Sequence, residues 1–332
     1  MDHSHLSRRQ LIAGTAAAAA AATAGLAGVA QAKAAPNQWS RRKQYKTIDG
    51  VRMAYYEVGR GDPIVFLHGN PTSSYLWRKV IPHVQDLGRC IAPDMVGMGD
   101  SAALPDSGPG VYTYVKQRKY LFALLEALGV EDNATLVIHD WGSAMGFDWA
   151  SQHPDKVRGI AYMEALLRAP NRNDDEVTPS KFFQVLRSER GEKAILEDNM
   201  FIELFLREVG LYLSDEDVAE YRRPFLEPGE SRRPMLEWPR EVPFGRDPAV
   251  NADIIERYSN WLAESDVPKL FVQATPGIIF SVDELRRFAR SLPNQKIVQV
   301  YGGHFVQEVS GDAIGRALRE WILALLIEQE AP

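Results

Sequence analysis

Short apolar runs alternate with amphipathic stretches along most of this chain. A short apolar or alternating run bounded by turn residues is typical of a strand, and apolar residues three or four positions apart are typical of a helix. Alternation of the two predicts a mostly parallel eight-stranded sheet with helices on both faces. The predicted strands are 44–48, 51–58, 63–67, 90–93, 135–138, 157–163, 266–273 and 296–300. The predicted helices are 74–84, 114–128, 143–150, 282–291 and 311–327.

One long interval, 166–250, breaks this alternation. It is charged, helix-forming and interrupted by five prolines between Pro224 and Pro243. We expect it to form a helical cap over the carboxyl ends of the strands, where open parallel sheets bind their ligands. The expected division is therefore a core domain of 33–165 with 251–332, and a cap domain of 166–250.

The first 32 residues have the pattern of an export signal. Arg8-Arg9 precedes an uncharged, mostly alanine run, and Ala30-Gln31-Ala32 places small residues at the positions of a cleavage site. We predict a twin-arginine signal peptide over 1–32, a periplasmic or secreted protein, and no stable membrane insertion after cleavage. The alternative is a membrane anchor, because the run is just long enough to span a bilayer, although alanine makes it a weak span.

The composition excludes several classes of function. Hydrophobic residues make up 45% of the 332 residues and charged residues 25%, which is ordinary for a globular protein. The net charge of −6, without a basic patch, argues against a nucleic-acid partner. Cys90 is the only cysteine, so no internal disulfide can form, and its apolar surroundings predict a buried thiol. The sequence contains no metal-ligand cluster, phosphate loop or dinucleotide motif, so we predict neither a metal nor an organic cofactor.

The stretch 135–149 is where the candidate chemistry is concentrated. A short apolar run enters His139-Asp140-Trp141-Gly142 and continues as a helical pattern, which is typical of the nucleophile elbow of α/β-hydrolases. Asp140 stands where that motif usually has serine. A carboxylate is already ionised at neutral pH and can attack carbon directly, without a base to activate it. The alternative is that Asp140 only caps the helix that follows.

Two side chains near this elbow could receive a leaving anion. The Trp141 indole and the Asn70 side-chain amide are neutral donors, which suit a halide ion that departs with growing negative charge. By analogy with the hydrolase elbow, their backbone N–H groups are expected to form the oxyanion hole. The alternatives are core packing for Trp141 and a turn position before Pro71 for Asn70.

A base and an acid complete the candidate site. His304 lies in Gly302-Gly303-His304 directly after the last predicted strand, where this fold places its histidine. Glu164 ends the sixth strand, and the loop after the seventh strand carries no acid, so Glu164 is the expected partner of His304. Its alternative role is that of an acid at a helix start. His68 and His139 are expected to orient the turns in which they lie.

Three motifs in this order resemble haloalkane dehalogenases of the branch with glutamate after the sixth strand. They are 68–78 (HGNPTSSYLWR), 139–143 (HDWGS) and 162–164 (YME). Parts of the interval 191–241 are also similar to coelenterazine luciferases. The resemblance implies an α/β-hydrolase fold and hydrolysis of small halogenated alkanes by water, through an aspartyl-alkyl ester, to an alcohol and a halide ion. It also implies that Phe183, Phe201 and Ile279 line the substrate pocket, and we add Leu167 beside them.

Three other functions stay open at this point. An epoxide hydrolase shares the aspartate elbow but needs two tyrosines aimed at the epoxide oxygen, and Tyr212 and Tyr221 are the candidates. A luciferase that oxidises coelenterazine is the second alternative. The third is an exported protein that binds a ligand in the same pocket without turning it over.

Overall fold

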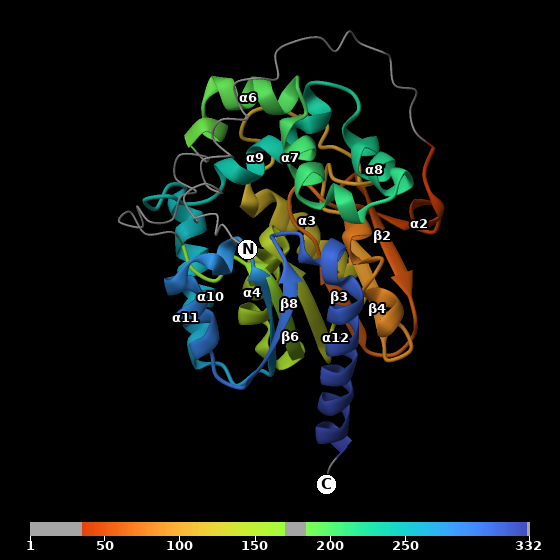
Figure 1. Cartoon of the computed structure of the whole chain (residues 1–332), viewed down its shortest axis with the longest axis vertical. Helices are drawn as coiled ribbons and strands as arrows, with labels where there is room; N and C mark the ends of the chain where they lie inside the picture. Colours follow the sequence, from red (N-terminus) through yellow and green to blue (C-terminus); the bar gives the residue numbers. More distant parts are fainter. Residues whose placement is uncertain (1–34, 170–183, 331–332) are drawn as a thin grey trace, which may run out of the picture. The chain divides into compact units, whose positions relative to one another are not determined.

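The protein forms an eight-stranded sheet in strand order β1-β2-β4-β3-β5-β6-β7-β8. The computed structural model describes residues 35–169 and 184–330, all within one compact unit, so the predicted signal peptide lies outside the described residues. Strand β2 runs antiparallel to β1 and β4, and the remaining pairs are parallel (Figure 1). The strands are β1 (Gln44–Ile48), β2 (Val51–Val58), β3 (Pro63–Leu67), β4 (Arg89–Pro93), β5 (Ala134–His139), β6 (Val157–Ala165), β7 (Lys269–Pro276) and β8 (Gln295–Gly302).

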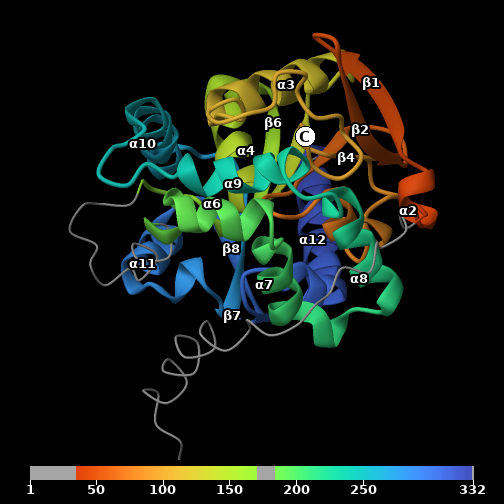
Figure 2. The same ribbon diagram turned by 90° about the horizontal axis from the view of Figure 1, so that it is seen from above.

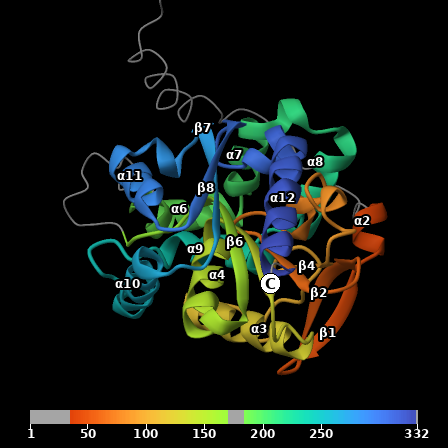
Figure 3. The ribbon, with the colours of Figure 1, turned by 90° about the horizontal axis from the view of Figure 1, so that it is seen from below.

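Helices cover both faces of the sheet because its strands are apolar on both sides. In β3, Val65 and Leu67 pack into one core cluster, whereas Ile64 and Phe66 pack into the other. The first cluster lies under α3 (Tyr114–Ala127), α4 (Asp140–Gln152), α10 (Ala249–Glu264) and α11 (Asp283–Ser291). The second lies under α12 (Val306–Glu330) and the 3₁₀ helices η2 (Ser74–Trp77) and η3 (Ile81–His83). Figure 3 shows α12 on one side of the sheet and α3 and α4 on the other.

The predicted sheet and its helical layers are confirmed, but several boundaries differ. The single helix expected over 74–84 is two 3₁₀ helices, since Pro82 lacks an N–H and its ring crowds the preceding turn. Strand β7 begins three residues later than expected, directly after Pro268, which cannot donate to the ladder. Helix α10 was not predicted. Cys90 is fully buried, and burial raises the pKa of its thiol to about 12.

The interval expected to form the cap is helical where the structure describes it. Viewed from above, its helices lie across the sheet (Figure 2). They are α6 (Glu189–Leu196), α7 (Met200–Val209), α8 (Asp215–Arg222) and α9 (Arg233–Arg240). Partly buried ion pairs join α8 and the turn after it to the sheet side, including Arg78 to Asp217 at 2.9 Å and Arg223 to Asp100 at 2.7 Å. Within the described ranges, no helix is both long and apolar enough to cross a membrane.

Candidate active site

Asp140 occupies the sharp turn between β5 and α4. Its φ of +50° is unusual for a residue with a side chain and is typical of strained functional positions. The turn is tight enough that a Cβ on Gly142 would lie 2.3 Å from the carbonyl oxygen of Leu67, so α4 packs directly against the end of β3. No side chain caps α4, and Oδ1 of Asp140 instead accepts the backbone N–H of Asn70 at 2.8 Å. The helix-cap alternative for Asp140 is therefore wrong.

His304 lies between two carboxylates. It sits in the short turn between β8 and α12, with Nε2 3.4 Å from Oδ2 of Asp140 and Nδ1 3.3 Å from Oε2 of Glu164. The side chains of His304 and Asp140 are 15% and 14% exposed, whereas Glu164 is fully buried. Solvent can therefore reach part of Asp140 and of His304 but not Glu164. The structure thus brings together the three residues that the sequence predicted, although they lie far apart in the chain.

Backbone groups hold Glu164 in place. Its Oε2 accepts the N–H groups of Ile278 and Ile279 at 2.9 and 2.7 Å as well as facing His304. Gly277, with φ of +66°, makes this close approach possible, because a Cβ there would lie 2.8 Å from Oε1 of Glu164. Sequence reasoning missed these donors. Ile279 was expected only to line the pocket, and a backbone N–H leaves no signal in residue type.

The charges in this site depend on one another. Burial raises the pKa of the Asp140 carboxyl, but His304 and the backbone N–H of Trp141 lower it by a larger amount, so the net effect is a lowered pKa. Burial lowers the pKa of His304, but Asp140 and Glu164 outweigh it and raise the pKa to about 10. Asp140 is therefore ionised at neutral pH and can act as a nucleophile without a separate base.

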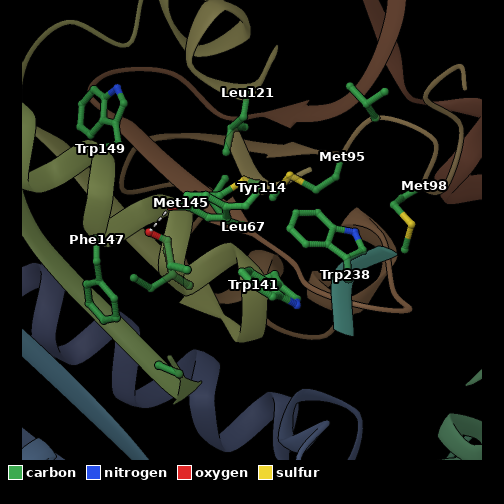
Figure 4. Packing of buried hydrophobic residues seen from close by; sticks show 14 of the residues in the cluster. Leu67, Met95, Met98, Tyr114, Leu121, Trp141, Met145, Phe147, Trp149 and Trp238 are labelled. Atoms are coloured by element: carbon green, nitrogen blue, oxygen red, sulfur yellow. Dashed lines mark hydrogen bonds between the residues drawn. The ribbon is translucent and has the colours of Figure 1, made fainter. Parts of the chain in front are cut away.

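Asn70 and Trp141 lie beside Asp140. Trp141 is 3% exposed, and its ring packs 5.0 Å from that of Trp238 and 5.7 Å from that of Tyr114 (Figure 4). Among the described residues, the Trp141 indole N–H donates to no protein atom. The Asn70 amide nitrogen donates one hydrogen to the carbonyl of Met235 at 3.0 Å and keeps a second. Two donors are thus available to an anion, and the contact with α9 was not visible in the sequence.

His68 and His139 connect the turns around the site. His68 accepts the backbone N–H of Met95 through Nε2 at 2.9 Å, and its Nδ1 donates to the carbonyl of Gly69 at 2.9 Å. Nε2 of His139 donates to the carbonyl of His304 at 2.9 Å, which joins the nucleophile turn to the histidine turn. Both residues therefore orient turns, as the sequence suggested, but their partners could not be predicted from it.

The predicted pocket residues are described in part. Leu167 is 1% exposed and lies two residues beyond Ala165, whose backbone pairs with Asp140. Phe201, on α7, and Ile279 are partly buried and pack against the first core cluster. Phe183 lies outside the described residues. Their contact with a substrate stays a prediction.

The fold and this site define an α/β-hydrolase, and the family model for the alpha/beta hydrolase fold matches residues 62–310. Among curated proteins, the chain is 49% identical over 282 residues to a haloalkane dehalogenase of Mycolicibacterium smegmatis, covering 85% of this chain and 91% of that protein. Among solved structures, haloalkane dehalogenase DbeA from Bradyrhizobium elkani superposes with a TM-score of 0.80 at 37% identity, covering 86% of this chain and 99% of that one. The chain therefore belongs to the haloalkane dehalogenase family.

A relative with a different activity is more distant. The coelenterazine h 2-monooxygenase of Renilla reniformis is 36% identical over 301 residues, which cover 89% of this chain and 94% of that protein. The similarity to luciferases expected from the sequence is thus confirmed, at lower identity than that to the dehalogenases.

Proposed function

We propose that this protein hydrolyses carbon–halogen bonds of small haloalkanes through a covalent ester on Asp140, releasing an alcohol and a halide ion. One observation carries the proposal. The Asp140 carboxylate has the uncharged N–H donors of Asn70 and Trp141 beside it and faces His304 at 3.4 Å. Membership in the haloalkane dehalogenase family supports the same reaction. No organic cofactor is needed, because displacement and ester hydrolysis use only a carboxylate, an imidazole and water.

In the first step, Asp140 attacks the carbon that carries the halogen. Oδ1 is held by the Asn70 backbone N–H, so Oδ2 forms the new carbon–oxygen bond. The halide leaves with the bonding electrons and accepts hydrogen bonds from the side chains of Asn70 and Trp141. Donors that are already in place stabilise the developing charge without reorganisation.

In the second step, water cleaves the ester. His304 takes a proton from water through Nε2, and the resulting hydroxide attacks the carboxyl carbon of Asp140. The backbone N–H groups of Asn70 and Trp141 stabilise the oxyanion that forms on Oδ1. Glu164, held by its two backbone donors, fixes the imidazole through Nδ1.

A halide-release panel on the purified protein tests this function. We expect halide from 1,2-dibromoethane and related haloalkanes. Turnover in ¹⁸O-labelled water should place heavy oxygen in the Asp140 carboxyl group, because the oxygen that enters the alcohol comes from Asp140 itself. Halide release without label in the peptide that contains Asp140 would exclude the covalent ester.

The two candidate tyrosines of an epoxide hydrolase are not placed for that role. The hydroxyl of Tyr221 donates to the Glu308 carboxylate, and the side chain of Tyr212 lies on the surface, where the residue is 45% exposed. Neither arrangement suits an electrophilic donor over Asp140, so the site favours halide as the leaving group. Diol formation from styrene oxide, or light emission with coelenterazine, would identify one of the alternative enzymes.

Replacing Trp141 by phenylalanine is expected to slow halide release. The aromatic packing against Trp238 is retained, and only the N–H is lost. We expect a decrease of about 10- to 100-fold, which corresponds to the roughly 1.5–3 kcal/mol of one hydrogen bond to a charged group. Single-turnover halide release measures it. The control is Trp149→Phe on the same helix, since Trp149 lies apart from the Trp141–Trp238 pair (Figure 4). Equal rates of halide release for Trp141→Phe and wild type would show that the indole N–H does not bind the leaving halide.

We also propose that the protein is exported through the twin-arginine pathway. Arg8-Arg9 ahead of an uncharged run and the small residues around Ala32 support this. The exported protein is expected to begin at Lys33, as measured by N-terminal sequencing. Replacing Arg8 and Arg9 together by lysine should leave the unprocessed chain inside the cell, and export that is unchanged in this variant would contradict the proposal.

A further inference from the structure

The groups around its ring set the charge state of His304 in the free enzyme. Asp140 faces Nε2 at 3.4 Å and Glu164 faces Nδ1 at 3.3 Å. His139 packs its ring 4.7 Å from the ring of His304. From the cap side, Glu208 on α7 accepts the backbone N–H of Phe305 at 3.1 Å, so it contacts the turn and not the ring.

His139 adds no positive charge to this cluster. Its Nε2 must carry the hydrogen, because its partner is the carbonyl oxygen of His304. Its Nδ1 has no partner within the described residues. Burial, together with the charge on His304, lowers the pKa of His139 to about 3, so this ring is neutral at every pH of interest.

Only one form of His304 suits two carboxylates. A neutral imidazole has one N–H and one lone pair, so one of its nitrogens would face an anionic oxygen with a lone pair. An imidazolium has a donor for each carboxylate. Its charge also offsets one of the two negative charges, of which Glu164 is fully buried. The raised pKa of His304 has the same cause.

Given the proposed function, we propose that His304 is an imidazolium in the resting enzyme, and that esterification of Asp140 releases its proton and so converts it into the base. In the ester, Oδ2 of Asp140 is bonded to carbon and carries no charge. Of the two carboxylates that stabilise the proton on His304, only Glu164 then remains. Alkylation, on this account, prepares its own hydrolysis.

The balance of atoms fixes when the proton leaves. In the first half, a carbon–oxygen bond forms on Asp140, the carbon–halogen bond breaks, and the halide departs with both electrons. The Nε2 proton of His304 then passes to solvent. In the second half, one hydrogen of water returns to His304 and the other ends on the alcohol, while Asp140 regains its carboxylate. One proton and one halide are therefore both released before the alcohol.

The two half-reactions should depend on pH in different ways. Attack by Asp140 does not require a neutral histidine, so the alkylation rate should stay flat as the pH falls from 9 to 6. Hydrolysis requires neutral His304 in the ester, where only Glu164 still raises its pKa. The hydrolysis rate should therefore rise with pH through that lower pKa and then level off.

Nitrogen NMR of the full-length protein with ¹⁵N-labelled histidine tests the charge state without any substrate. In wild type, the His304 ring nitrogens should keep imidazolium shifts from pH 6 to 9. Asp140→Asn reproduces the neutral ester and should move the midpoint down by about 1 to 3 in pH. His304→Gln assigns the signal, and intact mass verifies that the asparagine is retained. Glu208→Gln removes a charge from the same turn without touching the ring and should move the midpoint much less.

Two results would overturn the proposal. One is a neutral His304 ring at pH 7 in wild type. The other is a midpoint that is the same in Asp140→Asn and wild type. A failed haloalkane panel alongside the expected NMR result would instead refute the proposed function, so the two failures are distinguishable.

Discussion

Replacing His304 by phenylalanine is expected to stop the reaction after one halide per protein molecule and to leave the alkyl group on Asp140. The phenyl ring retains the packing against His139 and Phe305 but has no nitrogen to accept a proton from water. Loss of a general base costs about 10²–10⁴-fold in rate, so the ester should outlast its formation by a wide margin. Intact mass spectrometry after exposure to 1,2-dibromoethane measures the adduct, and peptide mapping locates it.

The control for this result is Asp140→Asn, which should release no halide and gain no mass, because an amide is a poor nucleophile. Release of one halide by the phenylalanine variant without an adduct would contradict the ester scheme. Continued turnover of the phenylalanine variant at the wild-type rate would show that His304 is not the base.

Replacing Gly69 by alanine is expected to disable the nucleophile. A Cβ at this position would lie 2.0 Å from Oδ1 of Asp140 and 2.5 Å from its Cγ, far inside contact distance. The carboxylate must therefore turn away from the Asn70 backbone N–H, which it now accepts at 2.8 Å. A misplacement of about 1 Å at a reacting centre can cost 10²-fold, so we expect at least about that loss in kcat/KM for halide release.

A matched glycine makes this test specific. Gly210 adopts helical angles, and a Cβ there would meet nothing within 4 Å. Gly210→Ala should therefore keep wild-type activity, and circular dichroism would show whether Gly69→Ala is still folded. Full activity in a folded Gly69→Ala variant would mean that Asp140 does not need its present position.

Much of the site could be predicted because its chemistry depends on side-chain type and local order. Asp140 follows a buried strand and precedes a helix. A carboxylate at such a turn was expected to act either as a nucleophile or as a helix cap. His304 and Glu164 each follow or end a strand of the same parallel sheet, whose carboxyl ends meet at one edge. The alternation of apolar runs and helical stretches was enough to predict the sheet and most of the helices that cover it. It did not predict helix α10 or the ends of a few elements.

Other features could not be predicted because they depend on where the chain returns in space. The N–H groups of Ile278 and Ile279 hold Glu164, and the carbonyl of Met235 holds Asn70, yet backbone groups are the same in every residue. Pro82 was visible in the sequence, but its division of 74–84 into two 3₁₀ helices was not.

The sequence by itself determined the order of the strands along the chain. Its residue types and their spacing were also enough to propose Asp140 as the nucleophile, His304 as the base and Glu164 as its acid. The tertiary structure alone decided the distances of 3.3 and 3.4 Å that place two carboxylates on one imidazole. Electrostatic interaction depends on separation and burial, which packing sets and which no local pattern of residues records.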